Sequence, residues 1–245
     1  VQISIPGVNI ATNVAMWDGD KWNMLNTFVG SSSDAVFSIK HLSSGLYAGT
    51  TSGLYKWNGT TWSTIGTIAG PFGNSLFITD IDEDVNGNVY VIGCFTTING
   101  ITVKGIAKWN GSSWQSMGSG ITNGTGNAYP YCLATIGTNV FIGGGFTAVN
   151  NVPANMVAKW NGTTWSAMGN GLSGTGTPQC MTAKGNNIYV GGYFSKTKAL
   201  EARTALLNSG YFYSVEPSAT KYEDGVYLTY NVVENMYVDK IEIEG

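Results

Sequence analysis

The chain has 245 residues and a formal net charge of −3, and only 11% of its residues are charged. Its eleven lysines and single arginine form no basic stripe, which argues against a nucleic-acid partner, and the absence of an 18-residue apolar run argues against insertion into a membrane. Aromatic residues make up 12% of the chain, whereas disordered chains are poor in them. The 34 glycines are about twice the average share of roughly 7%, and they favour many short strands joined by tight turns.

A short motif repeats along the chain and contains every tryptophan. Two Trp stand five positions apart in each of four copies, at residues 17–22, 57–62, 109–114 and 160–165. A degraded fifth copy at residues 207–212 keeps the spacing but carries Leu207 and Phe212 in place of the two Trp. The copies begin 40 to 52 residues apart, which is the length of a propeller blade.

Each repeat unit predicts four strands. In the unit that contains the fourth copy, we expect strands over residues 131–136, 139–146, 156–160 and 164–168. Asn161 and Gly162 join the last two strands, and the Asn-Gly pair predicts a type I′ turn with positive φ at both positions. Glycines within the second strand predict a bulge or a close approach of another backbone.

The repeat count predicts one all-β domain over residues 1–245, a single β-propeller with five four-stranded blades. The N- and C-terminal strands would close the ring, with the closing blade shared between about residues 1–28 and 215–245. In that arrangement residues 226–232 and 236–243 supply inner strands and residues 14–22 supply outer ones. Closure of this kind removes exposed strand edges.

These motifs resemble a known group of repeats. A Gly-Gly strand followed by an aromatic-Asn-Gly hairpin and a Trp is similar to kelch and galactose-oxidase-like propeller repeats, and the spelling Ala-Lys-Trp-Asn-Gly-x-x-Trp resembles repeats of fungal cortical polarity markers and bacterial surface proteins. The resemblance covers about residues 14 to 214 and implies a propeller fold. It implies little about activity, because propellers host many functions.

The chain is poor in the residues that the common chemistries of such folds need. Its single arginine, Arg203, cannot form the cluster that holds a sugar carboxylate in a sialidase. Its single histidine, His41, cannot supply two imidazole ligands to copper, and it stands beside a turn rather than in a recognisable triad. We therefore expect no enzyme, with a carboxylate pair for glycoside hydrolysis as the remaining enzymatic alternative.

One acidic stretch, residues 80–88, suggests a cation site. Asp82, Asp84 and Asn86 alternate before Gly87, as in the first half of a calcium loop. The alternative is a plain turn before a strand, because the glutamate that completes a calcium loop is missing: Gly93 stands there. Calcium is the only cofactor that the sequence suggests.

The tryptophans are the main candidates for ligand binding. Aromatic rings stack on sugars, so Trp62, Trp114 and Trp165 at equivalent blade positions could form the repeated pockets of a multivalent lectin. The alternative is that these rings pack neighbouring blades together. The cysteines fit no zinc spacing and are expected to be small buried core residues: Cys94, Cys132 and Cys180.

Together these features predict a non-enzymatic binding or scaffold propeller. We expect it to be secreted or displayed on a cell or virion surface and to mediate adhesion or protein interaction, with a protein or a surface glycan as its partner. The glycan-binding lectin is the first alternative and the carboxylate-based glycosidase the second.

Overall fold

The computed structural model describes residues 13–25, 28, 34–70, 75–124, 126–172, 176–192, 212–222 and 225–234. Over these ranges the chain is all-β, built from strands and turns. None of the described residues forms a helix that is long and apolar enough to cross a membrane. The chain divides into two compact units, the first made of Val1–Leu172 with Thr177–Gly192 and the second of Ser173–Gly176 with Tyr193–Gly245.

The first unit contains three larger sheets that repeat one strand order. Their main strands are β3 (Val36–Leu42), β4 (Gly45–Thr50), β5 (Gly53–Trp57) and β6 (Trp62–Ala69), then β7 (Phe77–Glu83), β8 (Val89–Cys94), β11 (Ile106–Trp109) and β12 (Trp114–Ser116), then β14 (Tyr129–Ile136), β15 (Asn139–Gly145), β18 (Val157–Trp160) and β19 (Trp165–Ala167). Each set of four is antiparallel and follows chain order across the sheet. The sequence prediction of repeated four-stranded units is confirmed.

Short strands extend or bridge these sheets. β9 (Thr97–Ile98) and β10 (Ile101–Thr102) continue the first sheet beyond β6, so that sheet has six strands. A separate three-stranded sheet contains β13 (Ile121–Thr122), β16 (Ala148–Val149) and β17 (Val152–Pro153). Segments inserted between the second and third strands of one repeat therefore reach toward the outer strands of its neighbour.

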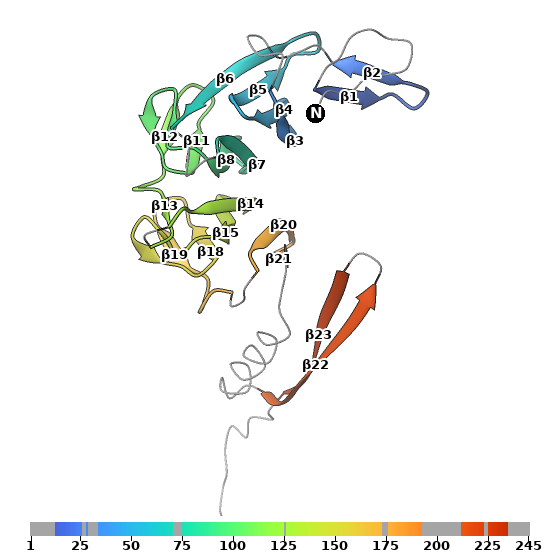
Figure 1. Ribbon diagram of the computed structural model, residues 1–245, viewed down its shortest axis with the longest axis vertical. Helices are drawn as coiled ribbons and strands as arrows, with labels where there is room; N and C mark the ends of the chain where they lie inside the picture. Colours follow the sequence, from blue (N-terminus) through green and yellow to red (C-terminus); the bar gives the residue numbers. More distant parts are fainter. Residues whose placement is uncertain are drawn as a thin grey trace, which may run out of the picture. The chain divides into compact units, whose positions relative to one another are not determined.

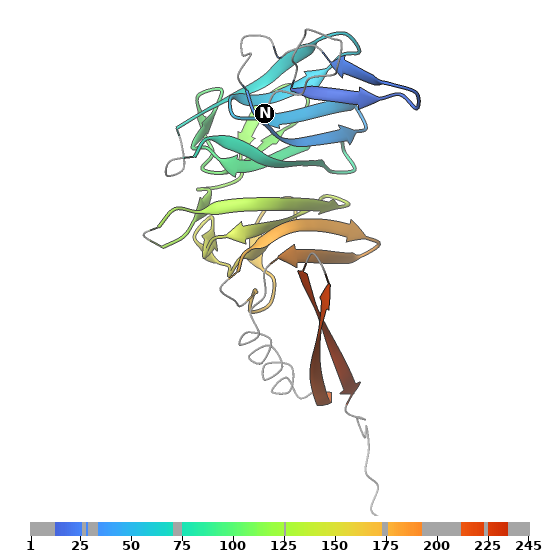
Figure 2. The ribbon, with the colours of Figure 1, turned by 45° about the vertical axis from the view of Figure 1, so that its right-hand side comes forward.

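Two further sheets of the first unit have two strands each among the described residues. One consists of β1 (Val14–Trp17) and β2 (Trp22–Leu25), which correspond to the outer pair of a repeat. The other consists of β20 (Pro178–Lys184) and β21 (Asn187–Gly192), which correspond to the inner pair. Figures 1 and 2 show these two half sheets at opposite ends of the row of sheets in the first unit.

Apolar cores lie between successive sheets. One cluster joins Val14 and Leu25 of the β1–β2 sheet to Trp62 of the next. A second lies between the first and second larger sheets, and a third lies between the second and third, where Trp165 packs. The first strands β3, β7, β14 and β20 lie beside one another in that order. These cores thus join the β1–β2 sheet and the three larger sheets in chain order.

The hairpin that joins the last two strands differs from the predicted turn. Trp57 pairs with Trp62, and the same register holds in each of the other copies, so the loop has four residues rather than two. Gly59 has φ +102°, but Asn58 does not have positive φ. The type I′ prediction is therefore wrong. Asn58 serves instead through its side chain, whose Oδ1 accepts the backbone N–H of Thr60 and Thr61 at 2.9 and 2.8 Å.

The predicted close backbone approach is confirmed at Gly93, Gly144 and Gly192, where an added Cβ would lie 2.1, 2.3 and 2.6 Å from a carbonyl oxygen of the first strand or of the residue before it. A second set of glycines faces side chains. The first strand of each repeat has a β-bulge, and after it Ser38, Cys132 and Cys180 stand opposite Gly49, Gly143 and Gly191. A Cβ at these three glycines would lie 2.5, 2.9 and 2.6 Å from the facing Oγ or Sγ atom. Glycine therefore leaves the room that the bulged side chain fills.

The second unit contains one described hairpin, β22 (Phe212–Tyr222) and β23 (Gly225–Glu234). The strand predicted over residues 226–232 is confirmed within β23. Its partner is β22, in a two-stranded sheet. The other segments assigned to the closing blade, residues 1–12 and 236–243, lie outside the described residues, as do residues 207–211 of the fifth motif copy.

Candidate functional site

The three tryptophans predicted to bind sugars are buried between sheets. The exposed fractions of Trp62, Trp114 and Trp165 are 1%, 5% and 5%. The indole nitrogen of Trp114 donates to the carbonyl of Ile65 at 3.0 Å, and that of Trp165 donates to the carbonyl of Met117 at 2.8 Å. Each acceptor stands three residues after the corresponding Trp of the preceding sheet, so each bond links one sheet to the one before it.

The ligand-binding prediction for these three residues is therefore wrong. A sugar stacks on an exposed aromatic face, and these faces are covered by the neighbouring sheet. The packing alternative explains them. In each of the pairs the first and second Trp rings lie 5.3–5.6 Å apart in a tilted arrangement, which is favourable for aromatic side chains.

The predicted calcium residues do not converge on a cation. Asp84 is buried and lies in the turn before β8, where its Oδ1 accepts the backbone N–H of Asn86 and Asn88. Its Oδ2 accepts the Asn88 side-chain amide at 2.8 Å and the Tyr90 hydroxyl at 2.9 Å. Burial opposes ionisation of Asp84, but the hydrogen bonds from Asn88, Tyr90 and Asn86 outweigh it and lower its pKa.

Asp82 faces away from this turn and toward the adjacent sheet. Its Oδ2 accepts the backbone N–H and the hydroxyl of Thr135, at 3.0 and 3.1 Å. Within the described ranges, no group of three or more His, Cys, Asp or Glu side chains is placed to hold a metal ion. The carboxylates of Asp82 and Asp84 thus accept hydrogen bonds from different parts of the protein, which favours the turn alternative over the calcium prediction for Asp82, Asp84 and Asn86.

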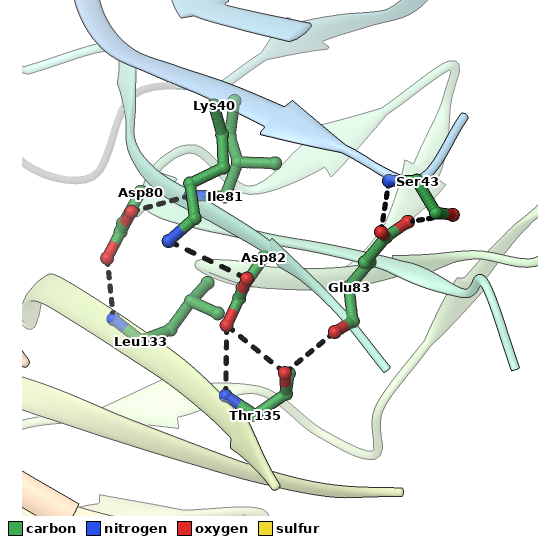
Figure 3. Close-up of polar contacts among 8 residues, drawn as sticks. All are labelled: Lys40, Ser43, Asp80, Ile81, Asp82, Glu83, Leu133 and Thr135. Atoms are coloured by element: carbon green, nitrogen blue, oxygen red, sulfur yellow. Dashed lines mark hydrogen bonds and ion pairs between the residues drawn. The ribbon is translucent and has the colours of Figure 1, made fainter. Parts of the chain in front are cut away.

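The densest polar arrangement in the first unit lies where β3, β7 and β14 run side by side (Figure 3). We call it the β7 carboxylate row, and it consists of Asp80, Asp82 and Glu83. Asp80 accepts the backbone N–H of Leu133 at 2.8 Å, and Asp82 accepts that of Thr135. These two N–H groups belong to the edge of β14 that is not paired with β15. The carboxylates therefore satisfy the free edge of the neighbouring sheet.

The same row also contacts the sheet on its other side. Lys40 of β3 lies 3.6 Å from Asp82 Oδ1 in an ion pair. Glu83 accepts hydrogen bonds from the backbone N–H and the hydroxyl of Ser43, which follows β3. The backbone carbonyl of Glu83 accepts the Thr135 hydroxyl at 2.7 Å. One strand, β7, thus holds both neighbouring first strands through its side chains (Figure 3).

Burial is the main influence on Asp80. It raises the pKa of this carboxyl, and the hydrogen bonds from Leu133 and Ile81 and the charge of Lys40 oppose that rise only in part. A carboxyl group with a raised pKa next to a second carboxylate, here Asp82, is the arrangement that the acid of a glycosidase needs. Both oxygens of Asp80 are nevertheless bonded to backbone N–H groups, of Ile81 and of Leu133. The geometry therefore supports a structural role for Asp80, in which its carboxylate joins β7 to β14.

The position that Asp80 occupies changes along the row of sheets. Ser38, Cys132 and Cys180 occupy the equivalent bulge position in β3, β14 and β20. Burial raises the pKa of Cys132 to about 12, and that of Cys94 to about 11. Cys94 and Cys132 are buried as predicted, but Cys180 is exposed and the prediction of a buried residue is wrong for it. No described sheet follows β20–β21 in the row to cover it.

Sequence reasoning missed the most exposed aromatic pair. Trp17 and Trp22 of the first motif copy have exposed fractions of 52% and 55%. Their motif keeps the Trp spacing but has Asp18, Asp20 and Lys21 where the other full copies have Asn, Ser or Thr. Among the described residues no sheet precedes β1–β2 to cover it. The available signal was the charged spelling of this copy, because the copies with a buried second Trp carry uncharged residues in the same turn.

Comparison with known families gives a match to part of the chain. Residues 181–235 match the family described as POTRA, a surface antigen variable number repeat. The match spans 55 of the 245 residues, begins within β20 and ends one residue after β23. No curated protein matches the chain.

Proposed function

We propose that this chain is a non-enzymatic binding or scaffold module that is secreted or displayed on a cell or virion surface. It would mediate adhesion or protein interaction, with a protein or a surface glycan as its partner. The observation that carries the proposal is the use of the polar side chains of the first strands. Asp80, Asp82 and Glu83 accept hydrogen bonds from neighbouring strands, so they serve the framework rather than a substrate.

The proposed fold is a β-propeller, in the five-bladed form that the repeat count predicts. The three larger sheets would be complete blades, and the β1–β2 and β20–β21 sheets would belong to two further blade positions. Strand order, the hairpin register and the indole bonds between successive sheets support this proposal. A closed ring also needs strands that complete both half sheets.

The matched family supports a location outside the cell only through its description as a surface antigen. The low content of charged side chains and the abundance of polar turns are compatible with such a display. The match includes β21 of the first unit as well as β22 and β23, so we propose that the sheets and the matched segment are displayed together.

Surface labelling tests the location. Antibodies raised against the purified chain should label intact cells or virions that carry the native protein, and Fab fragments should block their adhesion. Labelling that appears only after permeabilisation would overturn the proposal. Turnover of chromogenic glycosides that disappears in Asp80→Asn would instead establish the glycosidase alternative.

A further inference from the structure

A set of aromatic side chains that are not tryptophans lies at one end of the first strands. Each of these strands has a β-bulge near its start, and the extra residue of the bulge has no partner on the second strand. A bulge redirects the side chain of its extra residue, and here all four such side chains are exposed or partly exposed. Because the first strands lie side by side, the four bulges form a row across the sheets. Their extra residues are Phe37 in β3, Thr79 in β7, Tyr131 in β14 and Gln179 in β20.

The aromatic rings of this region stack in two nearly parallel pairs. The rings of Phe37 and Phe77, on neighbouring strands, lie 4.5 Å apart with an angle of 17° between their planes. Those of Tyr129 and Tyr131, both on β14, lie 6.4 Å apart at 10°. Phe37 is 50% exposed, and the other three residues are partly exposed. We call these four residues and Gln179 the bulge-end strip.

The middle of the bulge-end strip lies between sheets that are described on both sides. β7 lies between β3 and β14, and β14 lies between β7 and β20. The partial exposure of Phe77, Tyr129 and Tyr131 therefore does not result from an open end of the row of sheets. Thr79 joins two of these strands, because its hydroxyl donates to the Pro130 carbonyl at 2.9 Å. The strip thus has a fixed framework of neighbouring strands behind it.

The hydrogen-bonding groups of the strip are neutral. The amide nitrogen of Gln179 donates to the hydroxyl and to the carbonyl of Thr177, at 2.7 and 3.3 Å, so the amide is held in place and its oxygen can accept a bond from a ligand. Burial raises the pKa of Tyr131, so its hydroxyl stays protonated at neutral pH and can donate or accept. No side chain of the strip carries a charge, so the strip favours an uncharged ligand.

The strand edges beside the strip are closed to a peptide that would bind as an added strand. Such a peptide needs unpaired backbone groups on an edge strand. The carboxylates of Asp80 and Asp82 already accept backbone N–H groups on the edge of β14 that faces β7. What the strip offers is ring faces with a few neutral polar groups. A sugar matches this combination, because it has apolar ring faces and carries hydroxyl groups around its edge.

We propose that the bulge-end strip binds a neutral oligosaccharide. Sugar rings would stack on the exposed faces of Phe37 and Tyr131, and a sugar hydroxyl would donate to the amide oxygen of Gln179. This inference rests on the proposed function, in which a surface glycan is one of the two kinds of partner, and it gives that glycan a site and a chemical class. Because the rings lie on three neighbouring strands, successive sugar units would make separate contacts, and affinity should rise with the length of the oligosaccharide.

Titration calorimetry of the full-length chain with defined oligosaccharides tests the site. The probes are maltohexaose, cellohexaose and chitohexaose, each compared with its disaccharide. We expect at least one hexamer to bind, about tenfold or more tightly than its disaccharide. Phe37→Ala and Tyr131→Ala should each weaken that binding about tenfold through the loss of a stacking surface. Tyr189→Ala removes an exposed ring of β21 outside the strip and should leave the affinity unchanged.

Two further variants keep the test independent of folding. Tyr131→Phe retains the ring and removes only the hydroxyl, so it should keep most of the affinity that Tyr131→Ala loses. Gln179→Ala lies at an exposed position and should weaken binding about threefold or more through the loss of one hydrogen bond. The melting temperature of each variant shows whether a loss of binding accompanies a loss of stability.

Failure of all three hexamers to bind overturns the proposal, as does binding that the alanine variants of the strip leave unchanged. If decaproline binds more tightly than any hexamer and loses affinity in the same variants, the strip is a peptide-docking surface instead. None of these results changes the surface-labelling test, so failure of this inference is distinguishable from failure of the proposed function.

Discussion

The first hairpin and the last complete hairpin have one sequence motif in two surroundings. In β18–β19, Trp165 is 5% exposed and donates its indole N–H to the preceding sheet; in β1–β2, Trp22 is 55% exposed. Both hairpins have the same register, with their two Trp directly paired. The motif therefore determines the hairpin, whereas the presence of a preceding sheet determines whether its second Trp is part of the core.

Truncation of the buried tryptophan, Trp165, should have the largest effect on stability. Trp165→Ala removes a packed indole between two sheets and leaves the Met117 carbonyl without its donor. We expect it to lower the free energy of unfolding by about 3–5 kcal/mol. Urea denaturation followed by circular dichroism measures this loss, and a loss below about 1 kcal/mol would contradict the packing role.

A substitution in the β7 carboxylate row tests the hydrogen bonds between sheets without changing the Trp hairpins. Asp82→Ala leaves the backbone N–H of Thr135 without its acceptor while leaving every Trp in place. The expected loss is about 1–3 kcal/mol of unfolding free energy, because an orphaned donor bears its desolvation cost. Hydrogen exchange should show faster opening at Thr135 in this variant. An unchanged rate there would mean that the carboxylate does not hold β14.

Acid sensitivity should also differ between the two regions. Hydrogen bonds lower the pKa of both Asp84, in the turn before β8, and Asp18, in the first hairpin, but Asp84 is buried and Asp18 is fully exposed. The folded state then binds fewer protons than the unfolded state. This stabilisation is present at neutral pH and is lost as pH falls through about 3.8 and below.

Asp84→Asn should therefore flatten the decline in melting temperature between about pH 5 and pH 2, and Asp18→Asn should change it less because water screens its interactions. Melting temperatures recorded across this range test the difference. If both substitutions flatten the decline in melting temperature equally, burial of Asp84 does not explain its larger expected effect.

The smallest effect on stability is expected for the exposed tryptophan of the first hairpin, Trp22. Trp22→Ala should change the unfolding free energy of the isolated chain by no more than about 0.5 kcal/mol, since more than half of the side chain already contacts water. The measurement belongs at a protein concentration low enough to keep chains apart. A loss close to that of Trp165→Ala would show that another part of the chain covers Trp22.

The sequence predicted the repeated sheets well because hairpins and strands depend on local pattern. The spacing of the Trp pairs and the Gly-rich second strands located β14, β15, β18 and β19 to within a few residues. It failed where the outcome depends on the neighbouring sheet. Whether Trp62 binds a sugar or packs, and whether Asp82 faces a cation or the Thr135 backbone, depends on a strand some 50 residues away, which no local spacing encodes. The type I′ turn failed for a different reason, since Asn58 can act through its side chain as well as its backbone.

Exchange of the tryptophan indole protons tests the central claim most directly, namely that the indole N–H groups of Trp114 and Trp165 link their sheets to the preceding ones. In a ¹⁵N-labelled dilute sample, with peaks assigned by single Trp→Phe substitutions, the indole protons of Trp114 and Trp165 should exchange with deuterium far more slowly than that of Trp22. Rapid exchange at Trp114 and Trp165, or equal protection at Trp22, would contradict the account.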